Sequence, residues 1–183
     1  MQDNALKRVS IGDDFPDMDG LRRIMEAQFP GGEAFPVDEL RRVCAEKGFS
    51  FDAYYDGETL VGFLCLLETD EFCHGIYVAV APGLTGRGYG TKIIGSYLAE
   101  NRDKIFSCYV ESPDENAENA GQRRRRIALY ERLGMRLEDH EVLLTGLPHR
   151  LMSTAHFFPE EKRRRGAAFV REVDAMQDDI LGT

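Results

Sequence analysis

A glycine-rich loop constrains the fold of this chain more than any other feature of its sequence. The run from Cys73 to Val80 is strand-like and ends at Ala81-Pro82-Gly83. Thr85-Gly86-Arg87-Gly88-Tyr89-Gly90 follows, and from Thr91 to Asn101 the apolar residues recur at helical spacing. Glycines between a strand and a helix let backbone amides converge at a helix N-terminus, where the dipole favours negative charge. The loop therefore predicts an anion-binding site.

The rest of the chain predicts strands and helices around one mixed sheet. Phe49 to Tyr55, Asp56-Gly57 and Thr59 to Leu67 are typical of a β-hairpin. Further strands are expected at Leu6 to Ile11, Ile105 to Val110, Val142 to Leu144 and Arg150 to Ser153, the last two parted by Gly146-Leu147-Pro148. Further helices are expected around Leu21 to Met25, ending at Phe29-Pro30-Gly31-Gly32, from about Pro36 to Lys47, at Arg123 to Leu133 and at Pro159 to Ile180. This order indicates an α/β fold of the α+β type, in which helices flank a mixed, mostly antiparallel central sheet.

Length and charge limit the classes of function. A chain of 183 residues is expected to form a single domain over residues 1–183. A net charge of -9 disfavours a nucleic-acid partner, because binding nucleic acid requires neutralising phosphates. The sequence shows neither a signal peptide nor an apolar run of membrane-spanning length, so we expect a cytoplasmic protein without a membrane partner. The four cysteines lack metal-site spacing and are interpreted as reduced, structural thiols.

Two other phosphate-binding motifs fit the loop poorly. A Walker A loop requires GxxxxGK followed by Ser or Thr, and no register from Gly83 to Lys92 supplies it. A dinucleotide fingerprint requires GxGxxG, whereas Gly86, Gly88 and Gly90 place the third glycine one residue early. Glu111, after the next strand, would suit the ribose-binding acid of that fold, but the preceding hairpin does not suit a doubly wound sheet.

A third interpretation accounts for both the loop and a segment downstream. Val78-Ala79-Val80-Ala81-Pro82 followed by the glycine loop resembles the acetyl-coenzyme A signature of the GNAT superfamily of N-acetyltransferases. That signature has Arg or Gln, two residues, Gly, one residue, and Gly or Ala; here Gly88 and Gly90 match and Thr85 replaces the Arg or Gln. Ala128 to Met135 is similar to the family's second segment, AxxYExxGF, with Met135 in place of Phe. The resemblance covers roughly residues 5 to 155.

The resemblance implies a fold, a cosubstrate and a set of site residues. The sheet would splay between its fourth and fifth strands, and acetyl-coenzyme A would bind there without a metal ion. The expected cofactor-binding residues are Val78, Ala79, Val80, Thr85, Gly86, Arg87, Gly88, Tyr89, Gly90, Thr91 and Tyr130. Tyr130 would be the general acid that protonates the departing thiolate. The general base would be His74, at or near the strand position where the family often has Glu, with Glu111 in reserve and water as the third alternative.

The acceptor and the assembly stay open at this level. The acceptor would be a primary amine of a small molecule, peptide or protein, selected in this family by the first helices, the loop near Phe29 to Phe35 and the terminal hairpin. The chain would be a monomer or a homodimer. The alternative function is a non-catalytic sensor domain that binds acyl-coenzyme A. Arg123 to Arg126 is expected to be mostly a solvated helix face, with one or two arginines available to coenzyme A phosphates.

Overall fold

A computed structural model describes residues 5–29 and 36–181 of the chain, with side chains described as far as Met176. The expected end of the first helix at Pro30-Gly31-Gly32, and most of the loop from Phe29 to Phe35, lie outside the described residues. In chain order the described elements are β1 (Lys7–Ser10), α1 (Met18–Gln28), α2 (Val37–Lys47), β2 (Ser50–Asp56), β3 (Thr59–Glu68), β4 (Phe72–Val80), α3 (Tyr89–Glu100), β5 (Ile105–Glu111), α4 (Ala120–Arg132), β6 (Arg136–Leu144), β7 (Leu147–Ser153), the short 3-10 turn η2 (Ala155–Phe157) and α5 (Glu160–Leu181).

The strands form one mixed sheet in the order β1-β2-β3-β4-β5-β7-β6. Strands β1, β2 and β3 pair antiparallel, and so do β5, β7 and β6. The start of β4 runs parallel to β5. Two hydrogen bonds connect them: the Ile105 amide donates to the Glu71 carbonyl (3.0 Å), and the Ser107 hydroxyl donates to the Cys73 carbonyl (3.3 Å). The predicted mixed, mostly antiparallel sheet with flanking helices is confirmed. The expected splay between β4 and β5 stays a prediction.

The chain divides into two compact units. The first comprises residues 1–68 and 75–102, and the second comprises residues 69–74 and 103–183. Strand β4 therefore contributes its first residues to the second unit and the rest to the first. The single domain expected over residues 1–183 stays a prediction.

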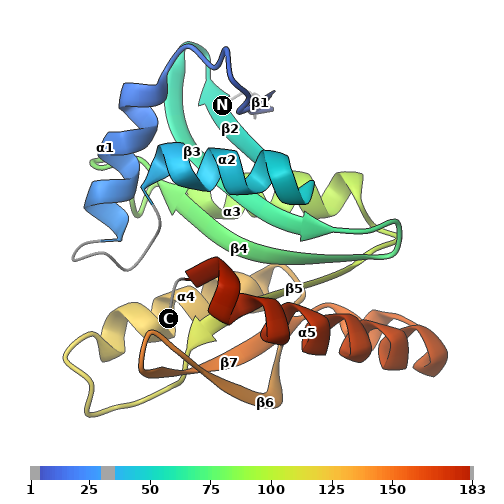
Figure 1. Ribbon diagram of the computed structural model, residues 1–183. Coiled ribbons are helices and arrows are strands. Elements are labelled where there is room, and N and C mark those ends of the chain that lie inside the picture. Colours follow the sequence, from blue (N-terminus) through green and yellow to red (C-terminus); the bar gives the residue numbers. More distant parts are fainter. Residues whose placement is uncertain (1–4, 30–35, 182–183) are drawn as a thin grey trace. The chain divides into compact units, whose positions relative to one another are not determined.

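In the first unit, helices cover both faces of the hairpin sheet (Figure 1). Helices α1 and α2 lie on one face and α3 lies on the other. The Asp17 side chain caps α1 by accepting from the Gly20 amide (3.0 Å), which satisfies one of the free donors of its first turn. Gly62 of β3 allows the closest approach in this unit, because a Cβ there would lie 2.2 Å from the Ala79 carbonyl oxygen.

In the second unit, side chains that alternate along β5 contact two different helices. Ile105 approaches α5 at Gly166, where an added Cβ would lie 3.1 Å from its Cδ1, and the Tyr109 hydroxyl donates to Asp174 of α5. Cys108, with the opposite parity, contacts Tyr130 of α4. One face of β5 therefore contacts α5, and the other contacts α4.

The terminal hairpin is confirmed, but its strands are longer than expected and its turn is shorter. Pro148 was expected in the turn and lies within β7, opposite Leu143. The turn is Thr145-Gly146, with both φ angles positive (50° and 80°), which is the geometry of a two-residue hairpin connection. Helix α4 begins at Ala120, three residues before the expected start at Arg123. Among the described residues, no helix has the length and apolarity required to span a membrane.

Candidate active site

The glycine loop adopts the backbone conformation that its composition predicts. Gly83, Gly86 and Gly88 have φ angles of 78°, 79° and 86°, in the left-handed region that side chains disfavour. Gly88 is the N-cap of α3, and no side chain caps that helix end. A Cβ at Gly88 would meet nothing within 4 Å, so the backbone angle, rather than lack of space, requires glycine there.

The N-terminus of α3 offers backbone donors to solvent. The first N–H to find an intrahelical acceptor is that of Lys92, which donates to the Gly88 carbonyl (3.0 Å). The amides of Tyr89, Gly90 and Thr91 precede it and have no acceptor within the helix. No acidic residue lies in the first turn of α3. Free donors and the positive end of the helix dipole therefore coincide where the sequence predicts an anion site.

Tyr89 ties this helix start to the preceding hairpin. Its hydroxyl donates to Asp56 Oδ2 (2.7 Å) in the β2–β3 turn, and this bond raises the pKa of the tyrosine. Thr85, Gly86, Arg87 and Gly88 are exposed. The Tyr89 side chain therefore contributes to the position of the loop, while the loop backbone faces solvent.

Strand β4 leads into this loop with alternating burial. Tyr77 and Ala79 are buried, whereas Val78 and Val80 are half-buried. The Ala81 amide donates to the Val61 carbonyl (2.9 Å), which fixes the strand end against β3. Val78 and Val80 thus share the less buried face of β4.

Tyr130 lies in the last turn of α4 and is 3% exposed. Burial, followed by the neighbouring Cys108 thiol, raises the pKa of the Tyr130 hydroxyl well above its ordinary value. Burial likewise raises the pKa of Cys108 to about 12. Both groups are therefore protonated at neutral pH, which suits Tyr130 to donating a proton and Cys108 to the structural role expected for it.

His74 lies in β4 with 1% of its surface exposed. Its Nδ1 is 2.9 Å from Ser107 Oγ, and its ring centroid is 5.1 Å from that of Tyr109. Burial lowers the pKa of His74 to about 3. A base this weak, with its ring enclosed, is poorly suited to taking a proton from an ammonium group. The geometry therefore disfavours His74 as the general base.

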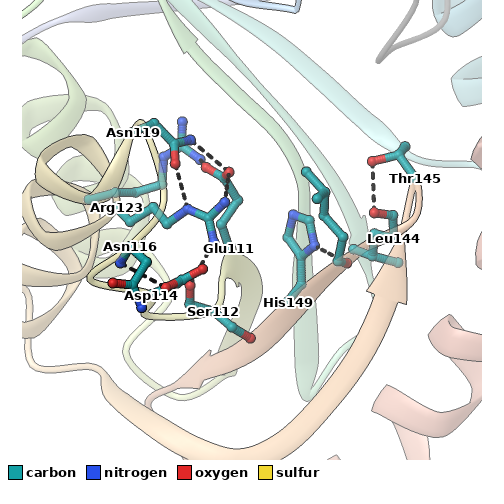
Figure 2. A network of polar contacts seen from close by, with 11 residues as sticks. Glu111, Ser112, Asp114, Asn116, Asn119, Arg123, Leu144, Thr145 and His149 are labelled. Atoms are coloured by element: carbon teal, nitrogen blue, oxygen red, sulfur yellow. Dashed lines mark hydrogen bonds and ion pairs between the residues drawn. The ribbon is translucent and has the colours of Figure 1, made fainter.

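Glu111, the reserve candidate, belongs to an ion-pair network at the end of β5 (Figure 2). Its carboxylate accepts from Asn119 Nδ2 (2.9 Å) and pairs with Arg123 (3.2 Å) and Arg126 (3.3 Å). Arg123 is 8% exposed and also donates to the Ser112 carbonyl (2.9 Å). Glu111 therefore connects α4 to β5, and a carboxylate engaged by three donors is poorly suited to acting as a base.

The arginine run is divided between structural and exposed roles. Arg123 is buried in the Glu111 network, Arg124 pairs with Glu115 at the surface, Arg126 pairs with Glu111, and Arg125 is exposed. The expectation of a mostly solvated face is confirmed for Arg124, Arg125 and Arg126, whereas Arg123 lies on the face of α4 that packs against β5. A contact of Arg124, Arg125 or Arg126 with a phosphate stays a prediction.

Comparison with known families decides the relationship. Residues 18–135 match the profile of the acetyltransferase (GNAT) family, which is more than half of the chain. The chain belongs to the GNAT family. The predicted resemblance is thereby confirmed, and the matched region contains both the glycine loop and Tyr130. A search of curated proteins found no significant match.

Solved structures share the fold of this chain beyond the matched segment. A protein assigned to the GNAT acetyltransferase family from Bacteroides thetaiotaomicron aligns with a TM-score of 0.72 at 22% identity, covering 97% of this chain and 99% of that one. A GNAT acetyltransferase from Elizabethkingia anophelis with acetyl-coenzyme A bound aligns with a TM-score of 0.57 at 13% identity, covering 82% and 97%. A spermidine N-acetyltransferase chimera built partly from the Vibrio cholerae enzyme gives 0.62 at 17%, covering 82% and 94%.

One cluster of polar residues in this GNAT chain was missed by the sequence analysis. Asp174 of α5 accepts from the Tyr109 hydroxyl through Oδ1 (2.6 Å), and its Oδ2 lies 3.0 Å from Nε2 of His140 in β6. Burial, then Asp174, raises the pKa of Tyr109. The members lie on three elements and two of them follow the matched segment, so no spacing along the sequence could have indicated the cluster. Within the described residues, no group of three or more His, Cys, Asp or Glu could hold a metal ion.

Proposed function

We propose that this GNAT-family protein is an N-acetyltransferase that moves the acetyl group of acetyl-coenzyme A to a primary amine by direct attack in a ternary complex. The observation that carries the proposal is the uncapped N-terminus of α3, which follows a loop of left-handed glycines inside the family match. Its free amides and dipole suit a pyrophosphate. The acetyl-coenzyme A bound in the Elizabethkingia anophelis relative supports the same cosubstrate.

The glycine loop and the end of β4 would hold the cosubstrate. Backbone groups from Gly86 to Thr91 would bind the pyrophosphate, with Thr85 and the Arg87 side chain at its edge. The backbone of Val78, Ala79 and Val80 would hold the pantetheine arm, and the Val78 amide would polarise the thioester carbonyl. Polarisation by a fixed donor stabilises the oxyanion of the tetrahedral intermediate.

Tyr130 would supply the proton for the leaving group. Tyr130 keeps its proton at neutral pH because burial raises its pKa, so its hydroxyl can hydrogen-bond the sulfur and give it a proton as the C–S bond breaks. Direct attack also needs a neutral amine nitrogen, so a base or solvent must remove one proton from the ammonium form. The sequence predicts His74 or Glu111 as the base. Because His74 is buried and Glu111 is bonded to Asn119, another group is better placed to act as the base.

Replacing Gly88 with valine tests the cosubstrate site. A valine at a φ of 86° would strain the N-cap and displace the amides, so we expect acetyl-coenzyme A affinity, measured by calorimetry, to fall at least tenfold, or about 1.4 kcal/mol. Gly146→Val is the matched control, because Gly146 has a φ of 80° and open space around it but lies in the β6–β7 turn. Unchanged affinity in a folded Gly88→Val variant would contradict the assignment.

Turnover is tested separately with a panel of primary amines and a thiol-release assay. Release of free coenzyme A that depends on one of the amines supports the enzyme. Tight binding of acetyl-coenzyme A without amine-dependent release from any acceptor class would instead favour the non-catalytic sensor.

A further inference from the structure

The second unit contains a cavity of about 570 Å³ between α5 with η2 on one side and the sheet on the other. Its apolar lining comes from Phe72, Ile105, Leu151, Phe169 and Val170. Sites for small molecules in proteins typically measure about 300 to 1,000 Å³ and combine apolar walls with a few polar groups. This cavity therefore has the size and the apolar walls of a small-molecule site.

Several polar groups converge on the same cavity. Ser107, Glu138, His140 and His156 all line it. His156 Nδ1 is buried and has no hydrogen-bond partner, which is uncommon for a buried polar atom. Desolvation, followed by the charge of Arg136, lowers the pKa of His156, so its ring is neutral at pH 7. A ligand with a hydrogen-bonding group would satisfy this nitrogen.

His140 is held in the cavity wall by Asp174. Its Nε2 lies 3.0 Å from the Asp174 carboxylate, so the neutral ring donates there and keeps the lone pair of Nδ1 available. The His140 side chain is 37% exposed, in contrast to enclosed His74. This arrangement of carboxylate and imidazole orients a base as the buried carboxylate does in hydrolase triads.

Other charged groups around His140 come from three elements. Tyr109 of β5 shares Asp174 with it, and their ring centroids are 6.1 Å apart. Asp139 of β6 and Arg171 of α5 also line the cavity, as does Arg163 at the start of α5. The two arginines disfavour a polyamine in this cavity, whereas the carboxylate of Glu138, which lines it, accommodates a single ammonium group.

We propose that this cavity binds the acceptor, a small primary amine with an apolar or aromatic body, and that His140 is the general base. This inference rests on the proposed acetyl transfer. The cavity lies next to His74, the residue that the family resemblance predicts as the base. Ser107 lines the cavity, and its hydroxyl forms a hydrogen bond with His74. Cavity-lining Ile105 and Ser107 have the parity opposite to Cys108, which contacts Tyr130, so base and acid lie on opposite faces of β5.

The proton balance of the step is complete. An ammonium N–H bond breaks, and its proton moves to Nδ1 of His140 to give an imidazolium. The freed lone pair forms the C–N bond, the C–S bond breaks, and the thiolate takes the proton of Tyr130. The surplus proton on the new amide nitrogen passes through water to the tyrosinate, and the imidazolium returns its proton to solvent. The products are amide, coenzyme A thiol and one proton.

Filling the cavity tests the acceptor site, with 2-phenylethylamine as the probe. Exposed Ala167 lines the cavity and the adjacent, half-buried Ala168 of α5 does not, so Ala167→Phe is the test and Ala168→Phe is its control. We expect Ala167→Phe to raise the KM for the amine at least tenfold while acetyl-coenzyme A affinity and thermal stability stay unchanged. Ala168→Phe should keep the wild-type KM.

A pH profile tests the base, since a purely structural histidine would not change it. Wild-type kcat/KM for 2-phenylethylamine should rise from acid towards neutral pH, as expected of a reaction that uses a general base. In His140→Gln that rise should disappear, kcat/KM at pH 7 should fall about 10² to 10⁴-fold, and activity should recover at alkaline pH, where the amine is neutral. His149→Gln is the control, because His149 of β7 does not line the cavity.

The outcomes separate the two proposals. If amines are acetylated but Ala167→Phe leaves the KM for 2-phenylethylamine unchanged, the cavity is not the acceptor site, and acetyl transfer stands. A wild-type pH profile in a folded His140→Gln variant overturns the assignment of the base. If acetyl-coenzyme A binds but no amine is acetylated, the proposed function fails, and the acceptor role of the cavity fails with it.

Discussion

The hydroxyl of Tyr130 hydrogen-bonds the Cys108 thiol, and both side chains are buried. Removing that hydroxyl in Tyr130→Phe keeps the ring that fills the space, so we expect unchanged thermal stability and acetyl-coenzyme A affinity. The kcat should fall about 10² to 10⁴-fold, because the thiolate loses its proton donor. Rapid-quench measurement of the acetyl-transfer step checks this prediction.

Alkaline pH distinguishes a catalytic tyrosine from one that only packs. Burial raises the pKa of Tyr130, so the wild-type enzyme should keep its acid in the protonated state above pH 10, where an ordinary tyrosine ionises. Equal single-turnover rates for wild type and Tyr130→Phe across the pH range would return Tyr130 to a packing role.

The roles of single residues followed from the sequence only where the backbone dictated them. Gly88 could be predicted, because a glycine at the N-terminus of a helix has one main conformational reason to be there. His74 and Glu111 could be identified as candidates by their position on strands. Whether they can act as bases depends on their surroundings: Ser107 and Tyr109 enclose His74, and Arg123 pairs with Glu111. The sequence does not show these contacts, because they join segments that are not adjacent along the chain.

At the scale of elements, the network of Glu111 and Arg123 connects the start of α4 to the end of β5. Replacing Arg123 with glutamine removes its bonds to Ser112 and Asn119 and leaves Glu111 with fewer partners. Breaking one partner of a buried ion pair costs about 3 to 5 kcal/mol. We expect a fall of that order in the free energy of unfolding, measured with urea.

Arg124→Gln is the control for Arg123, because the pair of Arg124 and Glu115 is exposed and such pairs contribute about 0 to 1 kcal/mol. A similar small loss in both variants would show that Arg123 lies on a solvated face, as its place in a run of four arginines suggested. The run itself could not reveal the difference, because which arginine turns inward depends on where α4 begins.

At the scale of the whole molecule, the order of elements could be predicted because hydrophobic period and turn residues are local properties. The division into two units and the cavity beneath α5 could not. Both depend on which helix face meets which strand, as at Gly166 against Ile105 and Phe169 against Phe72. The closing helix was expected at Pro159 to Ile180 and is confirmed, but its sequence alone does not show that Asp174 meets His140.

The stability of the whole fold should depend on pH through His74. Its folded pKa is about 3 against an ordinary 6.5, so the unfolded chain binds this proton more readily than the folded protein does. The stabilising contribution is therefore complete above pH 6.5 and is lost progressively as pH falls towards 3. Between pH 6.5 and 4.5 this group alone should cost roughly 2 kcal/mol, since each pH unit is worth about 1.4 kcal/mol once the unfolded imidazole is fully protonated.

Urea unfolding at pH 7 and pH 4.5 measures this loss for wild type, His74→Gln and His149→Gln. We expect His74→Gln to be less stable at pH 7, because Ser107 loses its partner, yet to lose less stability on acidification, because no buried imidazole has to be protonated on unfolding. His149 is half-buried, and its Nδ1 bonds the Leu147 carbonyl (2.9 Å), so His149→Gln should keep the wild-type slope. Identical slopes in all three proteins would mean that His74 is hydrated and able to titrate in the folded state, and it would then be restored as a candidate for the general base.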